Sequence, residues 1–577
     1  IILTQDITLG GDPTQYTLYT LSRGETTIKG GGNKITISNA GITVAKKGTV
    51  LNLGANGYDG TLTIDGKTSG GFVSVLEGAT ANMYENVTLQ NWTSAGNACV
   101  VIMGSDPVTG SKSVFNMHGG VIENCSRAVM ADSGTTFNMS GGEIRNREGS
   151  RGSGVHVFEA TFVMSGGTIS GCTANEGGGL YADNSIVTIN NGTISECEAA
   201  INEGGGLYAK NQSTITISGG TISGCKAPSS DKGNGSGLYA NKSTINISGG
   251  TISGCEGRWG GGLYAENSST IEISGGTISG CTVGAGGGLF VVGSTIRISG
   301  GIISECTTSD TGNGGGLYAK NSTIKITGGR IENNKAAHGG GVALIGDTTF
   351  EDSITNWTVI GNEAYATGGV GGGIKLENGS MDVSAGSNRI YNNTAGGQGA
   401  DIFLLGSSTI RLPNAANMGA KYHDSGINID NWYNDNPRYT PSESGEVVGA
   451  GVELKGGLSL VASYKAIPVR IEIDANGGKG GSGSQTVQKG TNVTLEAPTK
   501  EGHLFTGWKD EKGNSYPAGE DGKVNITVTD DMTLTAEWKK LPSTENLPKT
   551  GDESPVLLWG AALAVSAAAC FMLRRRK

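Results

Sequence analysis

Cysteine recurs at one fixed place in a repeated part of this sequence, three residues after the isoleucine of a Gly-Gly-x-Ile motif or a close variant of it. The seven positions are Cys125, Cys172, Cys197, Cys225, Cys255, Cys281 and Cys306. Thiols in a row could form disulfides or bind a metal, but no two of them make a Cys-x-x-Cys pair. We therefore expect a buried column of small apolar side chains and no metal site.

The acidic residues and histidines give no clear catalytic pattern. An enzyme that cleaves glycans with residues on stacked β-strands would need paired carboxylates on neighbouring strands. The residue after each Leu-Tyr-Ala-like motif varies in charge and type: Asp183, Lys210, Asn241, Glu266, Val292 and Lys320. The five histidines, His118, His156, His338, His423 and His503, are isolated in the sequence. We expect no catalytic residue and no cofactor, and a polysaccharide lyase or hydrolase remains the alternative hypothesis.

The strongest chemical signal lies near the carboxyl end. Leu547, Pro548, Lys549, Thr550 and Gly551 are followed by an apolar run at residues 556–573 and by the basic residues 574–577. Such a run is barely long enough to span a bilayer, and the basic tail would stay cytoplasmic.

These residues resemble the sortase-type cell-wall sorting signal. The resemblance implies that sortase cleaves between Thr550 and Gly551 and joins the Thr550 carbonyl to an amine of the peptidoglycan cross-bridge. A plain membrane anchor is the alternative. An upstream Leu-Pro-Ser-Thr-Glu sequence has Glu545 where glycine belongs, so we do not expect cleavage there.

Aromatic residues follow the leucine of six consecutive repeats: Tyr181, Tyr208, Tyr239, Tyr264, Phe290 and Tyr318. If this leucine points inward, strand alternation sends each aromatic ring outward, so that the rings form one exposed column. Two hypotheses follow. The column either stiffens the sheet by stacking, or it is a platform for sugar rings or an extended partner.

The period of the repeat predicts the fold that positions these residues. Nine anchor isoleucines from Ile122 to Ile331 are separated by 22 to 30 residues, and apolar residues lie seven and five positions before each. Each period offers three short β runs, with glycine, asparagine and serine at the corners. Because no unit can close a core alone, we predict a right-handed parallel β-helix.

Variation in repeat length falls in one corner, between the cysteine and the following glycine cluster. The longest variants are at residues 198–203, 226–234 and 307–313. We expect these segments to be variable loops along one edge of the solenoid.

Two further resemblances support the solenoid. The opening segments IILTQDITLGG and GTLTIDGKT are similar to coils of pectin-lyase-like β-helices, and RIENNKAAHGGGVAL resembles the polymorphic outer-membrane-protein repeat. A separate small domain follows the solenoid. Its motifs at 507–509 (GWK) and 536–538 (AEW) resemble the Listeria–Bacteroides repeat of internalin B, a β-grasp-like module; the resemblance implies a spacer or a weak binder.

The predicted all-β chain therefore has four parts. They are a β-helix at 1–419, a C-terminal cap at 420–467, the β-grasp-like domain at 468–540, and a linker with the sorting signal and transmembrane helix at 541–577. The chain begins at Ile1, so we expect an export signal upstream.

Composition excludes one class of partner. A net charge of −10 without basic stretches in the repeats argues against nucleic acid. We predict a secreted, cell-wall-anchored surface protein, an adhesin for host or environmental glycans or proteins. An inert stalk is a further alternative.

Overall fold

The computed structural model describes residues 1–10, 17–66, 73–92, 98–106, 108–145, 149–229, 231–351, 354–383, 388–411, 427–434, 453–455, 459–466, 468–488, 491–519, 521–528 and 530–541. These residues form strands and turns and no helix, so the all-β prediction holds for them. The chain divides into two compact units, Ile1–Lys465 and Ala466–Lys577. Within the described residues, no helix is long and apolar enough to cross a membrane.

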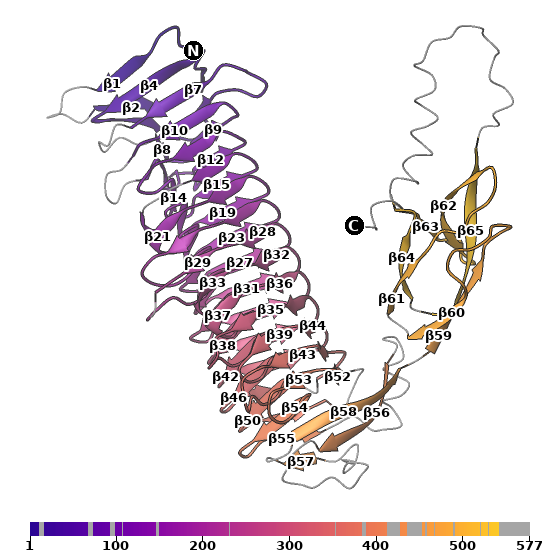
Figure 1. Ribbon diagram of the computed structural model, residues 1–577. Helices are drawn as coiled ribbons and strands as arrows, with labels where there is room; N and C mark the ends of the chain where they lie inside the picture. Colours follow the sequence, from indigo (N-terminus) through magenta and orange to yellow (C-terminus); the bar gives the residue numbers. More distant parts are fainter. Residues whose placement is uncertain are drawn as a thin grey trace, which may run out of the picture. The chain divides into compact units, whose positions relative to one another are not determined.

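The first unit is a parallel β-solenoid in which each coil adds one strand to each of several sheets (Figure 1). The leucine sheet contains the Leu-Tyr-Ala strands. It consists of β2 (Thr17–Leu21), β5 (Ala40–Val44), β8 (Val73–Leu76), β11 (Val100–Met103), β14 (Val129–Asp132), β18 (Val155–Phe158), β22 (Leu180–Asp183), β26 (Leu207–Lys210), β30 (Leu238–Asn241), β34 (Leu263–Glu266), β38 (Leu289–Val292), β42 (Leu317–Lys320), β46 (Val342–Ile345), β50 (Ile374–Glu377) and β54 (Ile402–Leu405).

The next strand of each coil belongs to the isoleucine sheet. It consists of β3 (Glu25–Ile28), β6 (Val50–Leu53), β9 (Thr80–Met83), β12 (Val114–Met117), β15 (Thr136–Met139), β19 (Thr161–Met164), β23 (Ile186–Ile189), β27 (Thr214–Ile217), β31 (Thr244–Ile247), β35 (Thr270–Ile273), β39 (Thr295–Ile298), β43 (Thr323–Ile326) and β47 (Thr349–Phe350).

The anchor sheet contains the Gly-Gly-x-Ile strands. It consists of β1 (Ile7–Gly10), β4 (Asn33–Ser38), β7 (Leu62–Asp65), β10 (Val87–Gln90), β13 (Val121–Glu123), β16 (Glu143–Arg145), β20 (Thr168–Ser170), β24 (Thr193–Ser195), β28 (Thr221–Ser223), β32 (Thr251–Ser253), β36 (Thr277–Ser279), β40 (Ile302–Ser304), β44 (Arg330–Glu332), β48 (Thr358–Ile360) and β52 (Arg389–Tyr391).

A fourth sheet, which the sequence did not predict, occupies the variable corner. This corner sheet consists of β17 (Gly149–Arg151), β21 (Thr173–Glu176), β25 (Glu198–Ala199), β29 (Lys226–Ala227), β33 (Glu256–Trp259), β37 (Thr282–Ala285), β41 (Thr307–Thr308), β45 (Lys335–Ala336), β49 (Glu363–Ala364) and β53 (Thr394–Ala395). The expectation of three β runs per coil is therefore wrong from Gly149 onward. The short segments that follow the cysteines form parallel strand pairs, because the register of the anchor strands places equivalent residues of neighbouring coils side by side. Lys226, for example, pairs with Glu256.

The stacked strands are in register, so like residues lie above one another. Leu207 pairs with Leu238, and Tyr208 pairs with Tyr239. The inward leucines and isoleucines form one continuous buried core along the solenoid. Alternation along each strand explains this core, because every second side chain points inward.

At the last coils the strand pairing changes from parallel to antiparallel. The parallel strands β51 (Ser380–Asp382) and β55 (Thr409–Arg411) are followed by β57 (Glu453–Lys455), which pairs antiparallel with β55. Strand β58 (Ser459–Ala466) pairs antiparallel with β54, and β56 (Ile427–Asn434) belongs to the same sheet. The edges of β54 and β55 are thus covered by antiparallel strands.

The second unit is a small β domain. Its strands are β59 (Pro468–Asp474), β60 (Gln485–Gln488), β61 (Thr491–Leu495), β62 (His503–Asp510), β63 (Ser515–Pro517), β64 (Val524–Val528) and β65 (Met532–Lys540). The sheet order is β60-β59-β65-β62-β63, and β61 pairs with β64. Trp508 and Ala536, from the two predicted motifs, face each other across the sheet and are buried. Gly507 has a φ of 150°, and a Cβ there would lie 2.3 Å from the Tyr516 carbonyl oxygen, so this position requires glycine.

Candidate functional site

The predicted aromatic residues form a continuous stack on the outer side of the leucine sheet, separate from the main core. Ring centroids of successive members lie 4.4 to 5.4 Å apart, with interplanar angles of 7 to 24°. We call this stack the ring ladder; it consists of Tyr181, Tyr208, Tyr239, Tyr264, Phe290 and Tyr318. His156 extends it by one coil, with its ring centroid 4.9 Å from that of Tyr181.

The expectation that these rings are exposed is wrong. The five from Tyr181 to Phe290 are only 1 to 8% exposed, and Tyr318 is half-buried. Their faces contact one another, so the faces are not free for a sugar ring to stack on.

A second column of residues covers the ladder and explains its burial. Its members end or follow the corner strands, just before a glycine with positive φ: Arg151, Glu176, Glu203, Asn234, Trp259 and Ala285. We call these six residues the facing column. The carbonyls of the last five members each accept a hydrogen bond from the glycine N–H of the preceding coil, beginning with Gly152 to Glu176 at 3.0 Å. Trp259 stacks on Phe290 at 5.4 Å, and Ala285 also packs against the ladder.

Glycine is required where the facing column turns into the leucine strand. Gly204 has a φ of 74°, and a Cβ there would lie 2.8 Å from the Cβ of Tyr208. The glycine clusters of the repeat are therefore needed for a tight turn over the ladder.

Three carboxylates of this region differ in their partners. Glu266 accepts hydrogen bonds from the hydroxyls of Tyr239 at 2.6 Å and Tyr264 at 3.3 Å. Glu176 forms an ion pair with Arg151 at 3.0 Å. Glu203 is half-buried, and burial, followed by the charges of Glu176 and Glu266, raises the pKa of Glu203 to about 7.

The raised pKa of Glu203 predicts a pH dependence of stability. In the unfolded chain this carboxyl should titrate near its ordinary pKa of 4.5, so between 4.5 and about 7 the folded state holds a proton that the unfolded state has lost. Stability should therefore fall as pH rises through this window. Glu203→Gln should lose less stability than the wild type as pH rises through this range. The urea midpoints of both proteins, measured below pH 4.5 and above pH 7, test this. The exposed Glu196→Gln serves as the control, and equal slopes in both variants would contradict the prediction.

The predicted cysteine column is buried, as expected. The described cysteines are all free thiols: Cys99, Cys125, Cys172, Cys197, Cys225, Cys255, Cys281 and Cys306. Neighbouring thiols and burial raise the pKa of Cys225 well above its usual value. Among the described residues, no group of three or more histidine, cysteine or acidic side chains could hold a metal ion.

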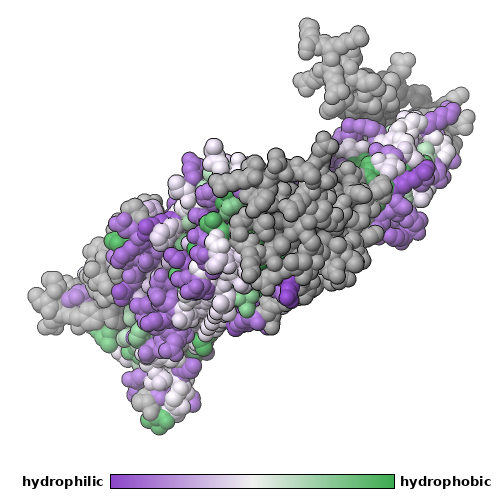
Figure 2. Space-filling view, turned by 90° about the horizontal axis from the view of Figure 1, so that it is seen from below, coloured by the Kyte–Doolittle hydropathy of each residue, from purple (hydrophilic) through white to green (hydrophobic). Residues whose placement is uncertain are grey.

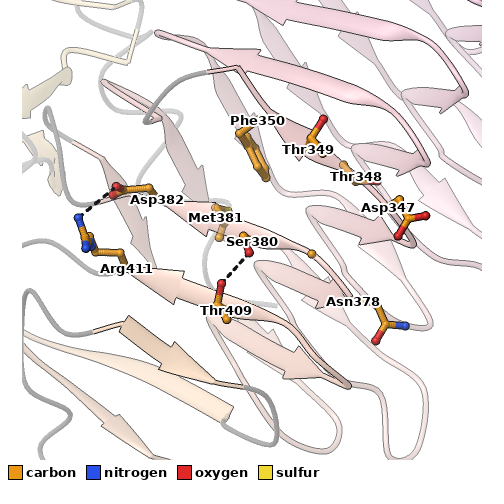
Figure 3. A pocket seen from close by; sticks show the side chains of 11 residues that line it. Asp347, Thr348, Thr349, Phe350, Asn378, Ser380, Met381, Asp382, Thr409 and Arg411 are labelled. Carbon is orange, nitrogen blue, oxygen red and sulfur yellow. Dashed lines mark hydrogen bonds and ion pairs between the residues drawn. The ribbon is translucent and has the colours of Figure 1, made fainter.

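A hollow of about 600 Å³ lies where the isoleucine sheet ends at β47 and a new sheet begins at β51 (Figure 3). Half-buried Phe350 lines it beside polar side chains. The Thr409 hydroxyl donates to Ser380 at 2.8 Å, and Arg411 lies 4.0 Å from Asp382. An aromatic ring among hydrogen-bonding groups suits a sugar. Sequence reasoning missed this site because the repeat pattern is interrupted there; the interruption itself, DTTFEDSIT at 347–355, was the only signal.

The first coils expose several large apolar side chains, among them Ile1, Ile2, Leu18 and Tyr19. The coloured residues of the face shown in Figure 2 are mainly hydrophilic or neutral, with small scattered hydrophobic patches. The predicted sorting residues Leu547, Pro548, Lys549, Thr550 and Gly551, and the apolar run at 556–573, lie outside the described residues.

Comparison with known families agrees with the geometry. Residues 108–278 match the family model described as the right handed beta helix region. This part of the solenoid is therefore similar to right-handed β-helices. Residues 470–542 match the model of the divergent InlB B-repeat domain, so the small domain is similar to that module, as its motifs predicted. No curated protein and no solved structure matches the chain. The more specific likeness to pectin-lyase-like and polymorphic-membrane-protein coils stays a prediction.

Proposed function

We propose that this chain is a surface-displayed, adhesin-type protein that is secreted and joined to the cell wall through Thr550. The observation that carries the proposal is the order of the carboxyl-terminal sequence. The pentapeptide at 547–551 precedes an apolar run and a basic tail. Sortase and an amine of the peptidoglycan cross-bridge would be the partners in anchoring.

The domain content supports a binding role. A β-helix followed by a B-repeat-like domain is compatible with a surface or adhesin-like protein. A solenoid is stiff because every coil is hydrogen-bonded to the next along its whole length. The hollow around Phe350 provides a place on this rod for a host or environmental glycan.

Deleting residues 547–551 tests the anchoring. We expect the protein to move almost completely from the muramidase-releasable wall fraction to the membrane and medium, because no acyl intermediate can form without Thr550. Deleting residues 541–545, the similar sequence that ends in Glu545, should leave wall attachment unchanged. Wall-bound protein at the normal level in the first deletion would overturn the proposal.

A polysaccharide lyase or hydrolase is the second candidate, and one observation favours it. A carboxyl with a pKa near 7, such as that of Glu203, is what a general acid or base requires. Release of reducing ends or unsaturated sugars from acidic polysaccharides, lost in Glu203→Gln, would select this alternative.

A further inference from the structure

Arg127 is a buried cation without an acidic partner. It lies just before β14 and is 8% exposed. Its Nε donates to the carbonyl oxygen of Arg151 at 3.1 Å, and its Nη1 lies 3.5 Å from the sulfur of Met130. None of the ion pairs found among the described residues includes Arg127. A buried guanidinium normally has a counter-ion, because removing its charge from water is costly.

Other basic and hydrogen-bonding groups lie around Tyr181, at the start of the ring ladder, in the coils that follow Arg127. The guanidinium carbon of Arg151 lies 5.7 Å from the ring centroid of Tyr181, and Lys210 Nζ lies 5.2 Å from it. The Tyr181 hydroxyl and His156 Nδ1 are buried. The Lys210 ammonium acts on the Tyr181 hydroxyl and lowers its pKa, and as a donor it leaves the hydroxyl proton free to donate to a ligand.

The charges of this cluster do not balance. Arg151 is paired with Glu176 at 3.0 Å, and Lys210 is paired with Asp183 at 3.1 Å. Of the three cations, Arg127 alone is left over. Burial, followed by the charge of Arg127, lowers the pKa of His156 to about 3. Burial and then Arg151 lower the pKa of Arg127 itself, so in both groups the largest charge effect, after burial, comes from a neighbouring arginine.

We propose that Arg127 and Arg151 bind an oxyanion, the carboxylate or sulfate group of an acidic glycan. Guanidinium groups hold such oxygens through paired N–H donors, and the Tyr181 hydroxyl adds a donor of its own. Arg151 is half-exposed and gives the ligand access. The inference names a ligand class for the proposed binding role and therefore rests on it.

The test uses the purified full chain and simple probes. Glucuronate, galactose 6-sulfate, inorganic sulfate and glucose are titrated while the histidine ring signals are followed by NMR. We expect saturable binding of the charged probes and none of glucose, and the ratio of the two sugar affinities identifies carboxylate or sulfate. Oxyanion binding should shift the His156 ring signals at neutral pH, because this ring contacts Tyr181 and is affected by the charges of Arg127 and Arg151. The other four histidines serve as internal references.

Two variants test whether Arg127 is responsible for oxyanion binding. Arg127→Met keeps the bulk without the charge and should weaken oxyanion binding at least about tenfold. Arg145→Met, whose arginine is already paired with Glu123 at 2.7 Å, is the matched control and should bind normally. If Arg127→Met does not fold, the half-exposed Arg151→Gln is measured in its place, with the same expected loss.

Two results would overturn the inference: wild-type protein that shows no saturable shift of His156 with any oxyanion, or a folded Arg127→Met variant that binds as well as wild type. Neither depends on wall fractionation. Failure of this inference is therefore distinguishable from failure of the anchoring proposal.

Discussion

Changing Tyr208, Tyr239 and Tyr264 together to serine is expected to detach the corner sheet from the solenoid. The three rings are 3 to 8% exposed and fill the space between the leucine sheet and the facing column. Removing one buried aromatic ring costs about 3–5 kcal/mol in a core, so we expect the triple variant to lose at least about 5 kcal/mol. The isoleucine and leucine core is a separate cluster and should persist.

Hydrogen exchange measures this effect locally, which suits a solenoid whose coils unfold unevenly. Residues 198–206, 226–236 and 256–262 should exchange faster in the serine variant, while the anchor strands β24, β28 and β32 keep their protection. Changing the same three tyrosines to phenylalanine keeps the stack and removes only the hydroxyls, so it should have a small effect. Unchanged protection in the serine variant would mean that the rings are an exposed surface, as strand alternation alone predicted.

The second large effect concerns a ladder of buried amides that continues the cysteine column. Asn334, Asn362 and Asn393 occupy successive coils after Cys306. The Asn334 side-chain oxygen accepts from the Cys306 N–H at 3.0 Å, and the Asn362 oxygen accepts from the Asn334 N–H at 3.0 Å. The ladder ends where the amide of Asn393 donates to Asp401 at 2.8 Å.

Asn362→Leu should strongly destabilise these coils. Asn362 is fully buried, and its amide donates to the carbonyl oxygens of Ile331 at 3.0 Å and Ile360 at 3.1 Å. Leucine would leave several buried polar groups unpaired, at about 1–3 kcal/mol each, for a total loss on the order of 4 kcal/mol. Urea unfolding and local hydrogen exchange measure the loss. Asn246→Leu, on the outer face of the isoleucine sheet, should change stability by less than about 0.5 kcal/mol. Similar midpoints for both variants would show that the ladder contributes little.

The repeat by itself determines the solenoid. A unit with apolar residues at alternate positions and glycine at its corners can bury its face only against its neighbours, so stacking and register follow from the sequence. The buried cysteine column follows for the same reason, since its spacing from the anchor isoleucine is constant. The motifs of the small domain were likewise sufficient to predict its module, because Trp508 and Ala536 are core positions of its sheet.

Only the tertiary structure decided what covers the outer side of the leucine sheet. Alternation predicts which side of its own strand Tyr208 occupies, but burial depends on the corner strands and the facing column, which come from another part of each coil. The same holds for Arg127. Its sequence neighbours give no sign that its guanidinium is buried beside Arg151 and Tyr181 without an acid, because coils distant in sequence supply those partners. Periodicity fixes the side of a strand on which a residue lies, whereas exposure and charge balance depend on what packs against that side.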